Sequence, residues 1–532
     1  MSEELKVARR AGVVGAATML SRVLGLVREQ VMAALFGAGL ATDAFNVAFR
    51  IPNLLRDLFA EGAMSSAFVP TFTAVQKQEG DAGAWAFGRQ LLVTLLLTLL
   101  VICAVGWVLA PQLVRLFAPG FAAVPGKLEL TVMLTRVMLP FLPAVALAAA
   151  AMGMLNARGS FAVPALAPTM LNLGMIVGGV SLIPVVQRLG QPAILAMALG
   201  VLIGGIGQFG CQLPALHRMG FRPRLEWPRA HPAVRRVGLL MGPAVIGLAA
   251  TQINLLVSTL IASLLEQGSV SWLAYAFRLM QLPIGVFGVA LATVSMPALA
   301  RAAVDQDMGS LKATLSATLR LVFLLTAPAA LWLAVMAVPV IALLYQHGRF
   351  VSVDTQRTAA ALVMYCVGLP AFAAVGVLTR TFYALGDTGT PVRASFVSVA
   401  LNLGLNLLFI GPLRPLGLGH AGLALATSVT SIANLIQLAW YLRRRVGPLE
   451  GRRMLNTLWR VSAAAAVATL PCAVGLALVG PPSGPWAAAL QVFAGMAVAL
   501  VVGYGAMRLL HVEELATVES LAAAMRRRLT GR

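Results

Sequence analysis

Five arginines lie inside long apolar segments of this chain, where a charge that faced lipid would be unfavourable: Arg22, Arg28, Arg50, Arg56 and Arg278. A guanidinium at the centre of a bilayer costs about 2.5–3.5 kcal/mol, so five of them would cost roughly 12–17 kcal/mol if each faced lipid. A planar guanidinium forms two parallel hydrogen bonds to phosphate oxygens and tolerates partial desolvation better than an ammonium group does. The arginines therefore predict a water-filled interior cavity that takes an anionic guest.

Acidic and polar side chains lie close to these arginines in the sequence. Asp57 follows Arg56 directly, and Glu29, Asp43 and Glu61 are near, so part of the positive charge is expected to be paired internally. Two alternatives stay open. The arginines could form structural ion pairs with no guest, and Arg50 could extend along its helix to the outer membrane interface. Arg115, Arg136 and Arg380 stand near segment ends and are expected at the interface.

Composition places the chain among membrane proteins. It has 532 residues, of which 59% are hydrophobic and 11% charged, and the mean hydropathy is +0.87. A helical span needs about 20 apolar residues. Apolar runs between glycine, proline and charged breaks predict an all-α polytopic fold of about fourteen spans, near residues 11–36, 42–76, 90–117, 128–156, 160–186, 191–217, 234–266, 270–300, 312–346, 358–385, 391–412, 418–444, 457–479 and 486–510.

The basic residues are distributed unevenly between alternate loops. The formal net charge is +21, and clusters at 218–236 and 443–453 fall on the same predicted side of the membrane. The opposite loops hold few basic residues: Lys127, Arg188, Arg349, Arg357 and Arg414. Because Lys and Arg are retained in cytoplasmic loops, both termini are predicted to be cytoplasmic. The basicity is explained by membrane insertion, and no nucleic-acid partner is expected.

The first and second groups of six spans repeat each other at an offset of about 229 residues. VAFRIPNL at 47–54 matches YAFRLMQL at 275–282, and MLNLG at 170–174 matches ALNLG at 400–404. An even number of spans in each unit gives both halves the same orientation, with a site expected between them. The sequence predicts an N-lobe over 1–225, a C-lobe over 226–448, two further spans over 449–512 and a cytoplasmic tail over 513–532, whose helix is expected to be interfacial or solvated.

Signals for catalysis, cofactors or metals are weak. The five histidines lack zinc-ligand spacing, no phosphate-binding nucleotide loop is found, and the four cysteines stand in apolar runs as small hydrophobes. No cofactor or metal is expected. Many prolines fall inside the spans, which predicts bent helices around a cavity that changes shape, with ordinary membrane kinks as the alternative.

The segment SRVLGLVREQVMAALFGAGLATDAFNVAFRIPNLLRDLFAEGAMSSAFVPTF at 21–72 closely resembles the lipid II flippase family MurJ, also called MviN. The resemblance continues through YAFRLMQLPIGVFGVALATVSMPALAR at 275–301 and, in hydropathy, over nearly the whole chain. It implies the multidrug/oligosaccharidyl-lipid/polysaccharide exporter fold, with two six-helix lobes around a cationic cavity and two C-terminal helices that form a groove for the lipid tail. The residues that it implies for substrate binding are Arg22, Arg28, Arg56 and Arg278, with Arg50, Ser21 and Asn53 beside them, and Asp43, Asp57 and Glu61 are the candidate charge partners.

Two departures from the family pattern affect the site. Many relatives have acidic residues before and after the arginine of the eighth span, where this chain has Phe277 and Gln281. Some relatives are proposed to bind sodium through carboxylates of spans seven and eleven, but here span seven has none and span eleven has Asn402 and Asn406. The sequence thus predicts a more positive cavity and gives no support for sodium coupling.

The resemblance implies that the chain is a transporter and not an enzyme. It would flip undecaprenyl-pyrophosphate-linked disaccharide-peptide, lipid II, from the cytoplasmic to the outer leaflet of the bacterial inner membrane by alternating access. Membrane lipids and cell-division or elongation synthases are the other expected partners. Three alternatives stay open: a drug/cation antiporter that uses an acid such as Glu61 or Asp43, a membrane-embedded polyprenyl-sugar transferase, and a non-transporting scaffold for cell-wall synthesis.

Overall fold

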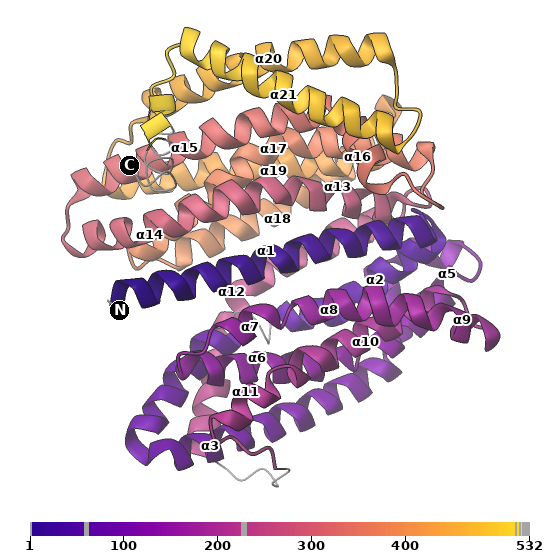
Figure 1. Cartoon of the computed structure of the whole chain (residues 1–532), viewed down its shortest axis with the longest axis vertical. Coiled ribbons are helices and arrows are strands. Elements are labelled where there is room, and N and C mark those ends of the chain that lie inside the picture. The colour runs from indigo at the N-terminus through magenta and orange to yellow at the C-terminus, as the bar shows by residue number, and fades with distance from the viewer. Residues whose placement is uncertain (1–2, 58–62, 225–230, 517–518, 521–522, 524–532) are drawn as a thin grey trace. The chain divides into compact units, whose positions relative to one another are not determined.

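The structure is a computed structural model, and its described secondary structure is entirely helical (Figure 1). It describes the backbone of residues 3–57, 63–224, 231–516, 519–520 and 523. Side chains are described for the same residues except 3–13, 63–66 and 242–251. The chain divides into two compact units, Met1–Ser271 and Trp272–Arg532, and each is described separately.

Unit 1 contains the following helices: α1 (Glu3–Phe36), α2 (Leu40–Arg56), α3 (Ala63–Val108), α4 (Ala110–Phe117), η2 (Pro119–Ala123), α5 (Lys127–Met138), α6 (Phe141–Ala157), α7 (Ala162–Leu166), α8 (Thr169–Leu173), η3 (Gly174–Gly179), α9 (Val180–Arg188), α10 (Ile194–Gly210), α11 (Leu213–Arg218) and α12 (Pro232–Ser263).

Helix α13 (Ser269–Pro283) begins just before the boundary between the units. Unit 2 continues with η4 (Ile284–Gly288), α14 (Val289–Val304), α15 (Met308–Val335), α16 (Ala337–Tyr345), α17 (Ser352–Ala384), α18 (Gly389–Ile410), η5 (Arg414–Leu416), α19 (Gly419–Val446), α20 (Gly451–Val479) and α21 (Pro485–Leu509).

The polytopic all-α fold predicted from hydropathy is confirmed. Within the described residues, 11 helical segments are long and apolar enough to cross a membrane. Three more helices, α1, α2 and α12, occupy the positions of the predicted first, second and seventh spans. Helices α1 and α2 carry four of the candidate arginines, which lower the mean hydropathy of these two helices. The predicted count of about fourteen is therefore approximate.

A kink lies between the predicted second and third spans. The sequence pattern predicted these spans over 42–76 and 90–117, and α3, which covers parts of both, has a φ of 71° at Gly80. Helix α2 lies in the first part of the predicted second span, and residues 58–62 are outside the described residues. A φ in the left-handed region favours glycine, which has no Cβ.

Irregular helix occurs where the sequence has glycine and proline. Helix α8 passes into the π-helical turn η3, and Pro283 precedes the π-helical turn η4. Proline has no N–H to donate to the preceding turn, and wider π turns restore hydrogen bonding next to such breaks. A π-helical turn of this kind is present in each unit, η3 in unit 1 and η4 in unit 2.

Glycines allow two helices of unit 1 to touch through their backbones. A Cβ placed on Gly174 would lie 2.4 Å from the backbone N of Gly204, and one placed on Gly204 would lie 2.6 Å from Cα of Leu171. Helix α10 thus packs directly on α8 and η3. Small residues at helix contacts let membrane helices approach closely, where van der Waals packing replaces the hydrophobic effect.

Adding a single methyl group to Gly204 should push α10 away from α8. We expect Gly204→Ala to lower the midpoint of thermal unfolding in detergent, with a loss of about 1–3 kcal/mol typical of overpacking. Gly210→Ala is the matched control, because it stands in the same helix and a Cβ there meets no atom within 4 Å. Equal midpoints for the two variants would show that α10 can move away from α8 freely.

Candidate functional site

Arg28 is the most deeply buried of the candidate arginines. It is 7% exposed, and its Nη1 donates to Oδ1 of Asn172 at 3.1 Å while Nη2 donates to Oε1 of Glu29 at 2.5 Å. Glu29 is 8% exposed. The Asn172 amide nitrogen in turn donates to the backbone oxygen of Ser21 at 3.0 Å, which joins α8 to α1. The guanidinium is therefore oriented by one carboxylate and one amide.

Asn172 was not predicted as a site residue. It reaches α1 next to Gly25, where an added Cβ would lie 3.8 Å from its amide nitrogen. The only sequence signal was the MLNLG match at 170–174, which marked the repeat and gave no reason to connect the asparagine to an arginine 144 residues away.

Arg56 is paired with its neighbour in the chain, as the sequence predicted. Its Nη2 and Nε lie 2.8 and 3.2 Å from Oδ1 of Asp57. The other carboxylate oxygen of Asp57 accepts from the amides of Asn53 and Gln252, each at 3.4 Å. The Arg56 side chain keeps 20% of its surface exposed, so it is paired and still accessible.

The remaining candidates are more accessible or lie outside the described residues. Arg22 and Arg278 are exposed, and Arg50 is half-buried. Ser21 is half-buried and contributes its backbone oxygen to Asn172. Glu61 falls in the segment 58–62, which lies outside the described residues.

Among the described residues of unit 1, Asp43 is the most completely bound carboxylate. It is 1% exposed and accepts hydrogen bonds from the backbone N of Gly268 at 2.8 Å, and from the backbone N and Oγ of Ser271 at 3.0 and 2.6 Å. Nζ of Lys127 lies 2.8 Å from the same carboxylate and also 4.1 Å from the ring centroid of Phe121. These donors occupy both carboxylate oxygens. An acid held in this way is structural, which weighs against the antiporter alternative for Asp43.

Lys127 was predicted only as one of the few basic residues of the outer loops. The structure places it at the start of α5 with 3% of its surface exposed. A lysine is buried this deeply only when a counter-charge compensates for its lost hydration. The sequence alone does not identify Asp43 as this counter-charge, because Asp43 and Lys127 are 84 residues apart.

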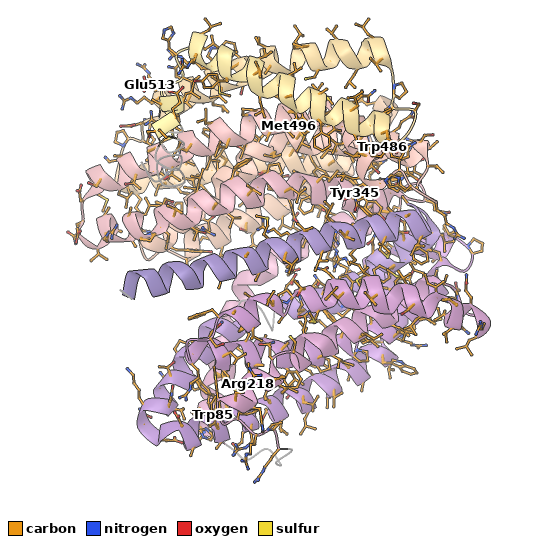
Figure 2. The ribbon with its side chains drawn as sticks, viewed as in Figure 1. Trp85, Arg218, Tyr345, Trp486, Met496 and Glu513 are labelled. Atoms are coloured by element: carbon orange, nitrogen blue, oxygen red, sulfur yellow. The ribbon has the colours of Figure 1, made fainter. Side chains whose placement is uncertain are left out.

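Arg278 is carried by α13, one side of which is fixed in unit 2. The indole Nε1 of Trp272 donates to Oδ1 of Asp354 at 2.9 Å, and Tyr275 packs on Tyr345 with ring centroids 4.9 Å apart. Trp272 and Tyr275 are buried, whereas Arg278 is exposed. Tyr345 is labelled in Figure 2. Helix α13 thus buries Trp272 and Tyr275 and leaves Arg278 on its exposed side.

The contacts made by Phe277, Asn402 and Asn406 are apolar or neutral. Phe277 lies against Tyr365 with ring centroids 5.4 Å apart. In α18, the Asn406 amide nitrogen donates to Oδ1 of Asn402 at 2.8 Å, and the Asn402 amide nitrogen lies 3.5 Å from Oγ1 of Thr430. Both asparagines are fully buried. Among the described residues, no three His, Cys, Asp or Glu side chains cluster as a metal site would require.

Comparison with known proteins assigns the family. Residues 32–493 match the sequence profile of the family described as MurJ, lipid II flippase. The chain belongs to the lipid II flippase MurJ family. A protein of Burkholderia cenocepacia named "Lipid II flippase MurJ" is 40% identical over 432 residues, which cover 80% of this chain and 82% of that protein. A protein of Vibrio cholerae named "Probable lipid II flippase MurJ" is 38% identical over 435 residues, 80% of each chain.

Solved structures agree with the family assignment. The structure titled "Lipid II flippase MurJ, inward closed conformation" superposes with a TM-score of 0.75 at 26% identity and covers 93% of this chain and 99% of its own. An inward-facing multidrug transporter of the MATE family, of the MOP superfamily, superposes with a TM-score of 0.65 at 16% identity, which shows a shared fold. The chain is thus a multi-pass bacterial membrane protein of a MurJ transporter family, and not an enzyme.

The Lys127–Asp43 pair should contribute strongly to the stability of this MurJ family member. We expect Lys127→Met to destabilise the protein by about 3 kcal/mol, the low end of the range for breaking a buried pair, because other donors still hold Asp43. Adding Asp43→Asn should recover part of the loss, since it removes the uncompensated charge. Thermal unfolding in detergent measures both effects, and Lys77→Met, at an exposed lysine of α3, is the control. A midpoint for Lys127→Met equal to that of Lys77→Met would contradict the pairing.

Proposed function

We propose that this chain flips lipid II from the cytoplasmic to the outer leaflet of the bacterial inner membrane. The observation that carries the proposal is the 40% identity, over four-fifths of the chain, to a relative named lipid II flippase. In this proposal both termini are cytoplasmic, as the distribution of lysine and arginine indicates. Two lobes, 1–225 and 226–448, alternate in access, and the helices of 449–512 hold the prenyl tail.

The candidate arginines supply the chemistry that a pyrophosphate headgroup needs. Arg22, Arg28, Arg56 and Arg278 are guanidinium donors, and charge-assisted N–H···O⁻ bonds are roughly twice as strong as neutral ones. Accessible Arg22 and Arg278 are suited to first contact with the headgroup. Arg28 and Arg56 are already held by Glu29 and Asp57, so a pyrophosphate would exchange one anionic partner for another without leaving a guanidinium bare.

Removing a cavity arginine should abolish transport without preventing membrane insertion. In proteoliposomes, Arg28→Ala and Arg278→Ala are expected to lose flipping of lipid II, because charged hydrogen bonds of about 1.5–3 kcal/mol each are lost. Arg188→Ala, at an exposed arginine in the last turn of α9, is the matched control and should flip normally. Normal transport by both test variants would remove the site assignment, and a new covalent lipid product would indicate the transferase alternative.

The membrane potential should contribute to the direction of transport. Moving one negative charge outward through about 100 mV, inside negative, gains about 2.3 kcal/mol, or roughly a fifty-fold change in distribution between leaflets. Vesicles that hold a potassium gradient with valinomycin provide a defined potential. The outer-leaflet fraction of lipid II should fall when the gradient is collapsed, and a fraction that stays constant would exclude coupling to the potential.

A further inference from the structure

A small polar pocket lies where the chain beyond α21 packs on α15 and α20. Helix α21 ends at Leu509, and His511 takes a φ of 51°, a left-handed conformation that reverses the chain. Val512 then packs in an apolar cluster with Leu324 of α15 and Val461 of α20. Helices α15 and α20 lie next to one another in unit 2 (Figure 1). The turn after α21 thus closes one side of the pocket.

The pocket is open to solvent and has a volume of about 250 Å³. Sites that enclose a whole drug-sized ligand are larger, about 300–1,000 Å³, so this one suits a single charged group. Three arginines and two glutamates give its lining a positive formal charge. We call the described residues that line it the tail pocket: Arg320, Arg453, Asn456, Thr457, Arg460, Val512, Glu513 and Glu514.

The buried acid of the tail pocket is already neutralised. One oxygen of Glu514 accepts from Nη1 of Arg320 at 3.0 Å and from Oγ1 of Thr457 at 2.9 Å. Glu514 is 6% exposed, so the start of the tail, which the sequence pattern assigned to a solvated or interfacial helix, is packed. Its neighbour Glu513, labelled in Figure 2, is 71% exposed and lies 3.7 Å from Arg320. The acid that could repel an anionic guest is therefore Glu513.

Two arginines of α20 keep donors for a guest. Nη1 of Arg460 donates to the backbone oxygen of His511 at 2.8 Å, which is a neutral acceptor. The Arg453 side chain is 65% exposed, and its Nη1 lies 3.7 Å from Oε2 of Glu450, beyond hydrogen-bond distance. A guanidinium has five N–H donors in a planar fork that matches phosphate oxygens. These two side chains therefore offer charged donors to a phosphate in the tail pocket.

The same turns of α20 also expose apolar surface. Arg453, Asn456 and Arg460 follow the spacing of one helix face. Leu455 and Trp459, on the adjoining face, are 68% and 70% exposed. Tryptophan is enriched at the membrane–water interface, where lipid headgroups lie. A guest that has both a phosphate and apolar chains could contact both faces at once.

We propose that the tail pocket binds the phosphate group of an anionic phospholipid of the surrounding membrane. Arg453 and Arg460 donate to the phosphate oxygens, and the acyl chains lie along Leu455 and Trp459. Basic pockets between transmembrane helices recognise anionic headgroups in this way. Glu513 opposes the anion and limits its affinity. The inference goes beyond the proposed function, since it involves neither lipid II nor the arginines of the candidate headgroup site.

Labelling by phosphatidylglycerol tests the tail pocket. The probe carries a diazirine in one acyl chain, and the purified full-length protein is labelled in detergent over a range of probe concentrations. Mass spectrometry measures the labelled fraction of residues 451–460. Phosphatidylcholine with the same chains and diazirine is the zwitterionic comparison. We expect saturable labelling by phosphatidylglycerol, with half-saturation at about tenfold lower concentration than for phosphatidylcholine, because charge-assisted hydrogen bonds favour the anion.

Variants of opposite expected sign separate the site from general damage. Arg453→Gln and Arg460→Gln should each weaken half-saturation by phosphatidylglycerol about tenfold, since each removes a charged hydrogen bond. Glu513→Gln removes a like charge and should tighten half-saturation by about threefold. Arg301→Gln is the matched control, because this arginine in the last turn of α14 is exposed and is not one of the described residues that line the pocket. It should bind as the wild type does.

Each contrary result would overturn the site. Such results are equal labelling by the two lipids, an equal loss in Arg301→Gln, or no tightening in Glu513→Gln. Glycerol 3-phosphate in large excess should leave the labelling unchanged, because it lacks acyl chains; if it displaces the probe, the guest is a soluble phosphate and the lipid assignment fails. A wild type that binds phosphatidylglycerol as expected but does not flip lipid II would refute the proposed function alone.

Discussion

The structure depends on one constraint, which is that charged side chains inside an apolar helical protein must have partners. Losing hydration in a low-dielectric interior is costly for any ion, and removing one member of a buried pair leaves the other uncompensated. Arg28 is held by Glu29 and Asn172, Lys127 by Asp43, and Arg320 by Glu514. Each pair also joins separate parts of the chain or orients a guanidinium. Charge pairing therefore organises the helices as well as making the ions tolerable.

Close helix packing makes these pairings possible. Asn172 lies in α8, and the η3 turn that follows α8 contacts the backbone of α10 at Gly174 and Gly204. Small residues at this contact let the helix that carries Asn172 pack closely on its neighbour. The same logic applies at the end of α21, where the left-handed His511 turns Val512 and Glu514 back onto neighbouring helices. Packing geometry thus determines where each charge is neutralised.

The sequence predicted those features that depend on local pattern. Helix-length apolar runs predicted the polytopic fold, and the adjacency of Arg56 and Asp57 predicted their pairing, which is confirmed. Long-range partners could not be predicted, because no periodicity connects Lys127 to Asp43 across 84 residues. Burial of Glu514 was missed for a related reason, because an acidic residue near a chain end is normally solvated.

Matching asparagines in the two halves of the internal repeat have different hydrogen-bond partners. Asn172 and Asn402 occupy matching positions in MLNLG and ALNLG, and both are buried amides. Asn172 accepts from Arg28, but about 229 residues after Arg28 the chain has Val257 and Ser258, so no matching guanidinium exists at this point of the repeat. Asn402 instead accepts from Asn406. Since an amide can accept from either a charged or a neutral donor, the same position serves a cationic group in the first half and a neutral pair in the second.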